Sequence, residues 1–245
     1  MTDYRALEQQ LASTLGLQRR PVAISFRNTV PDDLPRFEGT APSGCTFWRI
    51  AAEGRAFYTV PSDHWNCAVG AYTHNLPLPP EREHELGQTL ALMGDIGYLR
   101  MEEVPGIPRV RETPAAIVYA PLGESPFDPD VVVFAGPPGR VMLLQEAAIR
   151  AGVAAQLNML GRPTCMAVPA AQAMGMVAST GCVGNRVYTS LDEADLYAMV
   201  PGAALDTIAA ESVTIGSANA ALLAYHTSRK RELLSGPASA EADGR

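Results

Sequence analysis

Two kinds of hydrophobic spacing alternate along the N-terminal half of the chain. Apolar residues three or four positions apart, as in residues 3–16, favour an amphipathic helix, which Thr2 or Asp3 can cap. Short unbroken apolar runs next to proline or glycine favour strands. The pattern predicts helices over residues 3–16, 45–52 and 81–97 and strands over residues 21–27 and 55–61.

The C-terminal half contains longer apolar runs. Residues 115–122 and 130–136 are rich in valine and alanine with few polar interruptions, which suits central strands covered on both faces. Alanine and leucine are frequent after Gly139 and favour a long helix there. The pattern further predicts a helix over residues 141–160, a strand over 164–169, a strand or loop over 173–190, a helix over 191–200 and one or two closing helices over 204–233.

Two stretches of the chain have similar sequences. Residues 54–73 contain GRAFYTVP and then NCAVGAYT, and residues 161–189 contain GRPTCMAVP and then GCVGNRVYT. In both stretches an apolar run ends in Val-Pro, and a cysteine follows with glycine close behind. We therefore expect an internal duplication of a strand-helix-strand unit, which would give Cys67 and Cys182 related positions.

The order of the expected elements indicates the α/β (or α+β) class, with a mixed sheet flanked by helices. We expect residues 1–235 to form a single globular domain with two pseudo-repeated halves, at about 17–120 and 121–200. Residues 236–245 are small and polar and are expected to be a disordered tail.

The charge balance argues against nucleic-acid binding, because 19 lysines and arginines stand against 26 acidic residues and the net charge is −7. Lys230 is the only lysine, which removes most Schiff-base chemistry. No stretch approaches the roughly 20 apolar residues of a membrane span, and the first residues lack the apolar core of a signal peptide. We expect a cytoplasmic protein with a small-molecule partner and no nucleic-acid or membrane partner, and a homo-oligomer stays open.

Thiols stay reduced in the cytoplasm, so the four cysteines are interpreted as ligands, redox groups or buried thiols rather than as disulfides. His64 and Cys67 stand three residues apart in D-H-W-N-C, a spacing that puts both side chains on one face of a helical turn. Imidazole and thiolate are ligands of zinc, iron and iron–sulfur clusters. The structural alternative is a buried cysteine beside a surface histidine.

Cys182 lies in S-T-G-C-V-G-N-R, where Gly181 and Gly184 let the backbone approach a bound group and Arg186 adds a permanent positive charge. Such a loop can hold an anion or favour the thiolate of Cys182, and a tight turn with an inert thiol is the alternative. Cys45 lies at the expected start of a helix, where free backbone N–H groups favour a thiolate.

Cys165 lies in an expected apolar strand, where packing alone can explain it. The sequence contains no C-x-x-C, G-x-S-x-G or H-E-x-x-H motif, and G-P-P-G-R after residues 130–136 lacks the glycine and lysine pattern of nucleotide-binding loops. The run E-R-E-H-E at residues 81–85 can bind a metal, but an acidic first helical turn explains it more simply, and His74 is interpreted as a loop residue.

The segments that carry these cysteines also carry a family likeness. L-Q-R-R-P-V-A-I-S-F, G-C-T-F-W-R-I-A, D-H-W-N-C-A-V-G and S-T-G-C-V-G-N-R-V-Y-T together resemble the bacterial and archaeal family called domain of unknown function 169, over roughly residues 10–225. The resemblance implies that Cys45, Cys67 and Cys182 are site residues. It implies no substrate and no reaction.

The leading hypothesis is a site in which Cys45, Cys67 and Cys182, with His64 or Cys165, bind a metal ion or an iron–sulfur cluster. Such a centre would act on or sense a small ligand, for which an anion is one candidate. Arg49 and Arg186 would then orient the anion.

Two alternatives stay open. In the first, the protein is a metal-free binding module for a small organic ligand or cofactor, with Gly181 and Gly184 at its binding loop. Its pocket would be lined by the aromatic residues Trp48, Tyr58, Trp65 and Tyr72. In the second, Cys182 is a catalytic nucleophile and His64 its base.

Overall fold

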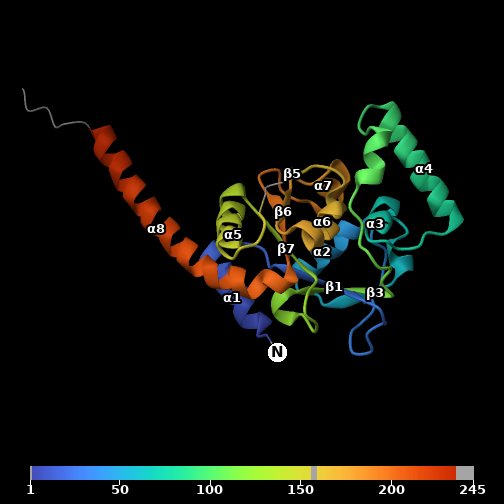
Figure 1. The fold of residues 1–245 in the computed structure, drawn as a ribbon, viewed down its shortest axis with the longest axis horizontal. Coiled ribbons are helices and arrows are strands. Elements are labelled where there is room, and N and C mark those ends of the chain that lie inside the picture. The colour runs from blue at the N-terminus through green and yellow to red at the C-terminus, as the bar shows by residue number, and fades with distance from the viewer. Residues whose placement is uncertain (1, 156–158, 236–245) are drawn as a thin grey trace, which may run out of the picture.

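A seven-stranded sheet forms the centre of the computed structural model, which describes residues 2–155 and 159–235. The strand order is β2-β3-β1-β4-β7-β6-β5 (Figure 1). Neighbouring strands run antiparallel except β5 and β6, which are parallel, so the sheet is mixed as expected. The strands are β1 (Val22–Arg27), β2 (Phe57–Thr59), β3 (Ala116–Pro121), β4 (Val131–Gly136), β5 (Met159–Leu160), β6 (Val177–Ser179) and β7 (Leu196–Pro201).

Helices cover both faces of the sheet (Figure 1). One face carries α1 (Tyr4–Leu15), α5 (Pro138–Arg150) and the first part of α8 (Leu205–Ser235). The other face carries α2 (Gly44–Ala52), α3 (Ala68–Thr73), α6 (Ala167–Met174) and α7 (Val183–Thr189). The remaining helices are α4 (Pro80–Asp95) and the 3₁₀ helices η1 (Pro61–His64), η2 (Met101–Gly106), η3 (Leu122–Glu124), η4 (Thr164–Met166) and η5 (Gly202–Ala204).

The unbroken apolar runs are explained by this double cover. In β4, Val131 and Val133 belong to the core beneath α2 and α6, whereas Val132 and Phe134 belong to the core beneath α1, α5 and α8. Side chains alternate between the faces of a strand, so both faces must be apolar when both are buried. The predicted central strands at residues 115–122 and 130–136 are thereby confirmed.

Three predicted elements of the C-terminal half are wrong, and the strand or loop expected over residues 173–190 contains the helix α7 after β6. Residues 164–169 form η4 and the start of α6 rather than a strand, because a short buried apolar run does not distinguish the two. Residues 191–200 are a turn followed by β7 rather than a helix. Asp192 caps that turn by accepting from the Ala194 N–H at 2.8 Å, so its acidic residues resemble a helix start. The long helix expected over residues 141–160 ends at Arg150.

The structure does not show the predicted internal duplication. The run that ends in Val-Pro forms β2 near residues 54–61 but η4 and α6 in residues 161–169. The two stretches share one structural feature only: Cys67 and Cys182 each occupy the N-cap of a short helix. The expected tail at residues 236–245 lies outside the described residues.

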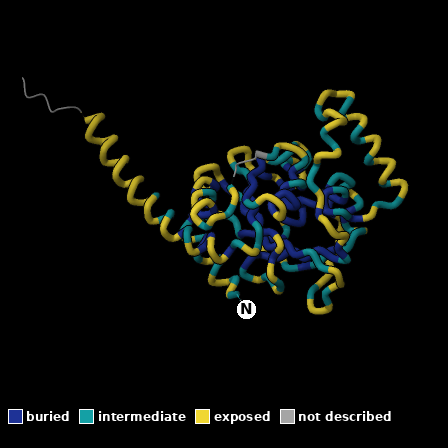
Figure 2. The backbone as a smooth tube through the Cα atoms, viewed as in Figure 1, coloured by how far each residue is buried: buried dark blue, intermediate teal, exposed yellow. Residues whose placement is uncertain are grey.

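Two helices extend from the body of the molecule. The second half of α8 is exposed along its length, and α4 has no buried residue (Figure 2). No helix in the described part of the chain combines the length and the apolar character needed to cross a membrane.

The burial of both sheet faces predicts that two apolar side chains of α5 contribute very differently to stability. Leu144 is 1% exposed, whereas Ile149 on the same helix is 49% exposed. We expect Leu144→Ala to lower the free energy of unfolding by about 2–5 kcal/mol, because it removes buried methyl groups and leaves a cavity. Ile149→Ala should change it by less than about 1 kcal/mol, as urea denaturation followed by circular dichroism will show. Equal losses would contradict the proposed cover of this sheet face.

Candidate thiol site

All four cysteines lie at the N-terminal ends of helices on one face of the sheet. Cys45 is the second residue of α2, and Cys67 and Cys182 are the N-caps of α3 and α7. Cys165 lies in η4, which runs directly into α6. At a helix start the backbone N–H groups have no partner within the helix and favour negative charge.

The starts of these helices are packed together. α2 contacts α3, η4 and α7, and α3 contacts η4. The Cys182 N–H donates to Thr164 Oγ1 at 2.5 Å, and the Cys165 thiol points to the Val69 carbonyl at 3.9 Å. A negative charge on any of the other three cysteines would raise the pKa of Cys45, so the four thiols form one electrostatic group. Cys45, Cys67, Cys165 and Cys182 are called the thiol cluster below.

Burial controls the protonation of the thiol cluster. It raises the pKa of Cys45, Cys67 and Cys165, in each case as the largest cause. At Cys67 the backbone N–H groups of Gly44 and Gly70 oppose this rise, and at Cys45 the Asn185 side chain does so. These three thiols are therefore neutral at physiological pH when nothing is bound.

Two glycines let neighbouring groups come close to the thiol cluster. A Cβ on Gly70 would lie 2.9 Å from Cys67 Sγ, closer than such atoms approach in proteins. Gly181 has a φ of 77°, and a Cβ there would lie 2.8 Å from Asn185 Oδ1. Gly184, the other glycine predicted at this loop, lies in α7 with only the Tyr188 ring near its open side.

Several buried polar atoms around the thiol cluster lack hydrogen-bond partners among the described residues. The Tyr119 hydroxyl is one, and both polar atoms of the Asn185 amide are others. Burial raises the pKa of Tyr119 well above its usual value, and the nearby Cys45, Cys165 and Cys67 raise it further. Unpaired buried polar groups are uncommon and often mark the place of a bound group or an ordered water.

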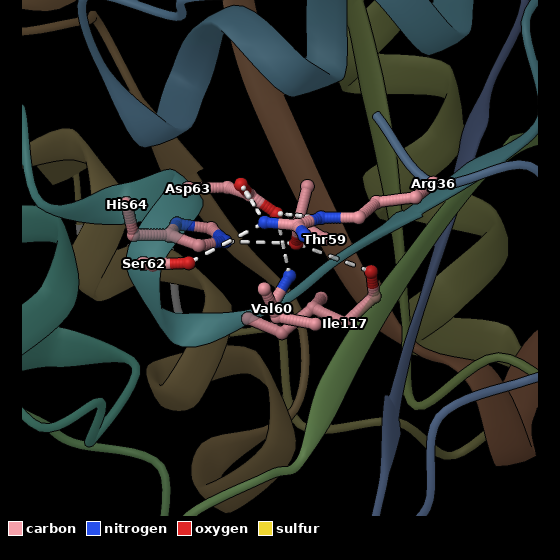
Figure 3. A network of polar contacts seen from close by, with 7 residues as sticks. All are labelled: Arg36, Thr59, Val60, Ser62, Asp63, His64 and Ile117. Carbon is pink, nitrogen blue, oxygen red and sulfur yellow. Dashed lines mark hydrogen bonds and ion pairs between the residues drawn. The ribbon is translucent and has the colours of Figure 1, made fainter. Parts of the chain in front are cut away.

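His64 lies beside the start of α2 and is held by a polar network (Figure 3). Its Nε2 is 2.8 Å from Thr59 Oγ1, and the Thr59 hydroxyl donates to the Ile117 carbonyl at 3.3 Å. Because the single hydroxyl hydrogen is used there, Nε2 must carry the histidine proton and Nδ1 keeps a free lone pair. Nδ1 has no hydrogen-bond partner among the described residues.

The Asp63 carboxylate closes this network on the solvent side (Figure 3). It accepts from the Val60 N–H at 2.8 Å and pairs with Arg36 at 2.8 Å. These contacts fix η1, and through it the position of the His64 ring, 4.8 Å from the Phe47 ring centroid.

The other predicted ligand-binding residues have partners within the protein. Arg49 lines a cavity between α2 and the sheet and pairs with Glu53 at 3.0 Å. Arg186 donates to the backbone carbonyls of Asp192, Thr180 and Asp195 and so holds the loop before β7. The Trp65 indole donates to the Pro77 carbonyl at 3.2 Å.

Within residues 2–155 and 159–235 no three histidine, cysteine, aspartate or glutamate side chains are arranged to hold a single ion. Sequence reasoning also missed Tyr119, Asn185 and His74, because a tyrosine inside an apolar strand and an asparagine in a glycine-rich loop give no periodic signal. His74 was predicted to be a loop residue, yet it is 1% exposed at the end of α3.

Comparison with known proteins agrees with the family likeness of the sequence. The family model DUF169, described as uncharacterised ArCR, matches residues 10–211. An uncharacterized protein of Methanocaldococcus jannaschii, MJ0308, is 28% identical over 155 residues, which cover 61% of this chain and 66% of that protein. No solved structure matches the chain.

The two buried histidines predict that acid weakens the fold. Burial lowers the pKa of His64 to about 3 and that of His74 to about 4, whereas an unfolded histidine titrates near 6.5. Between these values the unfolded chain binds protons that the folded chain does not, so stability is lost as the pH falls below about 6.5. We expect each histidine to cost about 2 kcal/mol between pH 7 and pH 5.

The measurement is urea unfolding at both pH values. In His74→Gln the loss of stability between pH 7 and pH 5 should shrink by about 2 kcal/mol, because the titrating group is gone. His84→Gln, at an exposed position on α4, serves as the control and should keep the original pH dependence. The interpretation fails if both variants and the original protein show the same loss.

Proposed function

This chain belongs to the DUF169 family, and we propose that it holds an iron–sulfur cluster through Cys45, Cys67, Cys165 and Cys182. The observation that carries the proposal is the convergence of all four cysteines, from distant parts of the sequence, at packed helix N-termini. Thiolates are the usual ligands of such clusters, and four of them complete the common ligand set.

A single ion and a cluster place different demands on the positions of the sulfur ligands. One zinc ion with bonds near 2.3 Å would draw its sulfur ligands to about 3.8 Å from one another. No such group exists among the described residues. In a four-iron cluster each iron takes its own cysteine, so the sulfur ligands stand farther apart than around one ion.

The surroundings of the thiol cluster suit an anionic inorganic group. The Gly44 and Gly70 N–H groups point to Cys67, and hydrogen bonds of this kind to sulfur stabilise and tune iron–sulfur centres. The Tyr119 hydroxyl and the Asn185 amide supply further unused polar groups inside the same region. The thiols would lose their protons on binding, and the positive iron would compensate for the burial of the resulting thiolates.

Access to the centre would be from the side of Cys67 and Cys182. These two cysteines are partly exposed, whereas Cys45 and Cys165 are buried. A cluster held in this way has one side toward solvent, which suits electron exchange or contact with a small ligand. His64, with its free Nδ1 beside the start of α2, would lie on the inner side of the centre.

A cysteine nucleophile is supported less well. The reactive form of cysteine is the thiolate, and nucleophilic cysteines have lowered pKa values. Three members of the thiol cluster have raised pKa values instead. His64 Nε2 is engaged by the Thr59 hydroxyl at 2.8 Å, so that nitrogen is not available as a base.

Anaerobic reconstitution with iron and sulfide tests the proposal directly. We expect broad visible absorption and stoichiometric iron and sulfide in the purified protein. Cys45→Ser and Cys165→Ser should each lose most of the bound iron and sulfide, because serine is a poor ligand for these clusters. Zinc in place of iron and sulfide would overturn the cluster in favour of an ion site, and the absence of all three would overturn both.

The close contact at Gly70 gives a second test that leaves every sulfur in place. In Gly70→Ala the new methyl group would displace the Cys67 sulfur, so the content of iron and sulfide should fall severalfold. Gly87→Ala is the matched control, since it also lies in a helix and its added Cβ would meet nothing within 4 Å. Equal cluster content in the two variants would contradict the assigned role of Cys67.

A further inference from the structure

A cavity of about 410 Å³ lies between α2 and the sheet, and none of the four cysteines lines it. Its floor is the sheet, at Val22, Val133 and Tyr197, and its walls are α2 and the end of α7. Residues 18–20, which join α1 to β1, form one side of its mouth. The volume is within the range of small-molecule sites, which combine an apolar body with a few polar groups.

The wall of this cavity contains a buried donor with nothing to bind. Trp48 is 2% exposed, and its Nε1 has no hydrogen-bond partner among the described residues. Its neighbour Tyr197 packs edge to face against it at 5.5 Å, but the Tyr197 hydroxyl already donates to Thr189 Oγ1 at 3.2 Å. The indole N–H is therefore the free donor in this wall, and a buried donor of this kind favours a ligand oxygen.

The arginines at the mouth of the cavity differ in how firmly acidic residues of the protein hold them. Arg20 is held by Glu8 at 2.6 Å and Glu124 at 2.7 Å. Arg49 has a single partner, Glu53, at 3.0 Å with both side chains largely exposed. A surface pair of this kind contributes little stability, so Arg49 can exchange its partner for a ligand anion.

A second arginine can assist Arg49. Arg19 lies at the same mouth and reaches Asp195 only at 3.6 Å, a loose contact. Glu53 is the one acidic residue among those that line the cavity, against Arg19, Arg20 and Arg49. The lining thus combines positive charge at the mouth with apolar strand residues and a free N–H inside.

We propose that this cavity binds a small carboxylic acid with an apolar or aromatic body and a second oxygen. The carboxylate meets Arg49 and Arg19 at the mouth, and the body lies against Val22 and Val133. The second oxygen accepts from Trp48 Nε1. The site is separate from the thiol cluster and does not require a bound metal.

The two regions nevertheless share supporting elements. Cys45 and Trp48 are one turn apart on α2. The Asn185 side chain lowers the pKa of Cys45. The Thr189 hydroxyl, at the cavity wall, donates to the backbone carbonyl of Asn185 at 2.8 Å. A ligand in the cavity would therefore contact the two helices, α2 and α7, that carry Cys45 and Cys182.

Tryptophan fluorescence of the metal-free protein tests the proposal. The chain has two tryptophans, so Trp65→Phe leaves Trp48 as the only one. The probes are benzoate, 4-hydroxybenzoate and phenylpyruvate, with 4-hydroxybenzamide as a neutral analogue of similar shape. We expect saturable change in Trp48 emission with at least one of the acids at millimolar concentration or below, and at least about tenfold weaker binding of the amide.

Two arginine variants in the Trp65→Phe protein separate recognition from general charge. Arg49→Gln should weaken the binding of the acid by at least about tenfold, because the substitution removes the charged hydrogen bonds at the mouth of the cavity. Arg82→Gln is the matched control: Arg82 also pairs with a glutamate on its own helix, at 2.6 Å, but lies on α4. Its affinity for the acid should be unchanged.

The donor is tested by Trp48→Phe in the otherwise unmodified protein, with calorimetry in place of fluorescence and circular dichroism to show that the fold is kept. We expect weaker binding of 4-hydroxybenzoate than in the original protein and little change for benzoate, which lacks the second oxygen. No binding of any of the three acids, or equal affinity in Arg49→Gln and Arg82→Gln, would overturn the proposal. Neither result would affect the iron and sulfide content, so the cavity and the thiol cluster can fail independently.

Discussion

A sheet that is apolar on both faces must be covered on both faces, and the rest of this structure follows from that constraint. The central strands β1, β4 and β7 each send alternate side chains into two separate cores. One cover consists of long helices, of which α5 and α8 pack against each other. The other consists of short helices that begin near a common point. Short helices have many ends for their length, and their exposed amide groups are the feature that makes a polar site feasible inside an apolar layer.

The sequence predicted the scaffold better than the order of its C-terminal elements. Strands β1, β3 and β4 and helices α1, α2 and α4 were found because their spacing or composition has one interpretation. β7 was missed because Asp192 and Glu193 precede it and mimic the acidic first turn of a helix, whereas Asp192 in fact caps a turn. α6 was missed because its first five residues, 167–171, are all apolar and all buried, so they carry no amphipathic signal.

The composition of the candidate site was partly accessible from sequence, but its geometry was not. The cysteines stood out because thiols are rare and three of them had glycine neighbours. Their meeting depends on the packing of α2 against α3, α7 and η4, which no local pattern encodes. Tyr119 and Asn185 could be recognised only once burial showed that their polar atoms lack partners among the described residues. Rarity of residue type is therefore a useful guide to which residues matter, and a poor guide to what surrounds them.

Burial and helix polarity act in opposite directions on the thiol cluster, and their balance explains its chemistry. In the unbound protein burial prevails, so Cys45, Cys67 and Cys165 stay protonated and unreactive. The amide groups of Gly44 and Gly70 reduce the penalty without removing it. A site of this kind resists alkylation and oxidation while it is empty, because few thiolates form. If the proposed cluster is bound, its positive iron atoms would compensate for the burial of several sulfur anions at once.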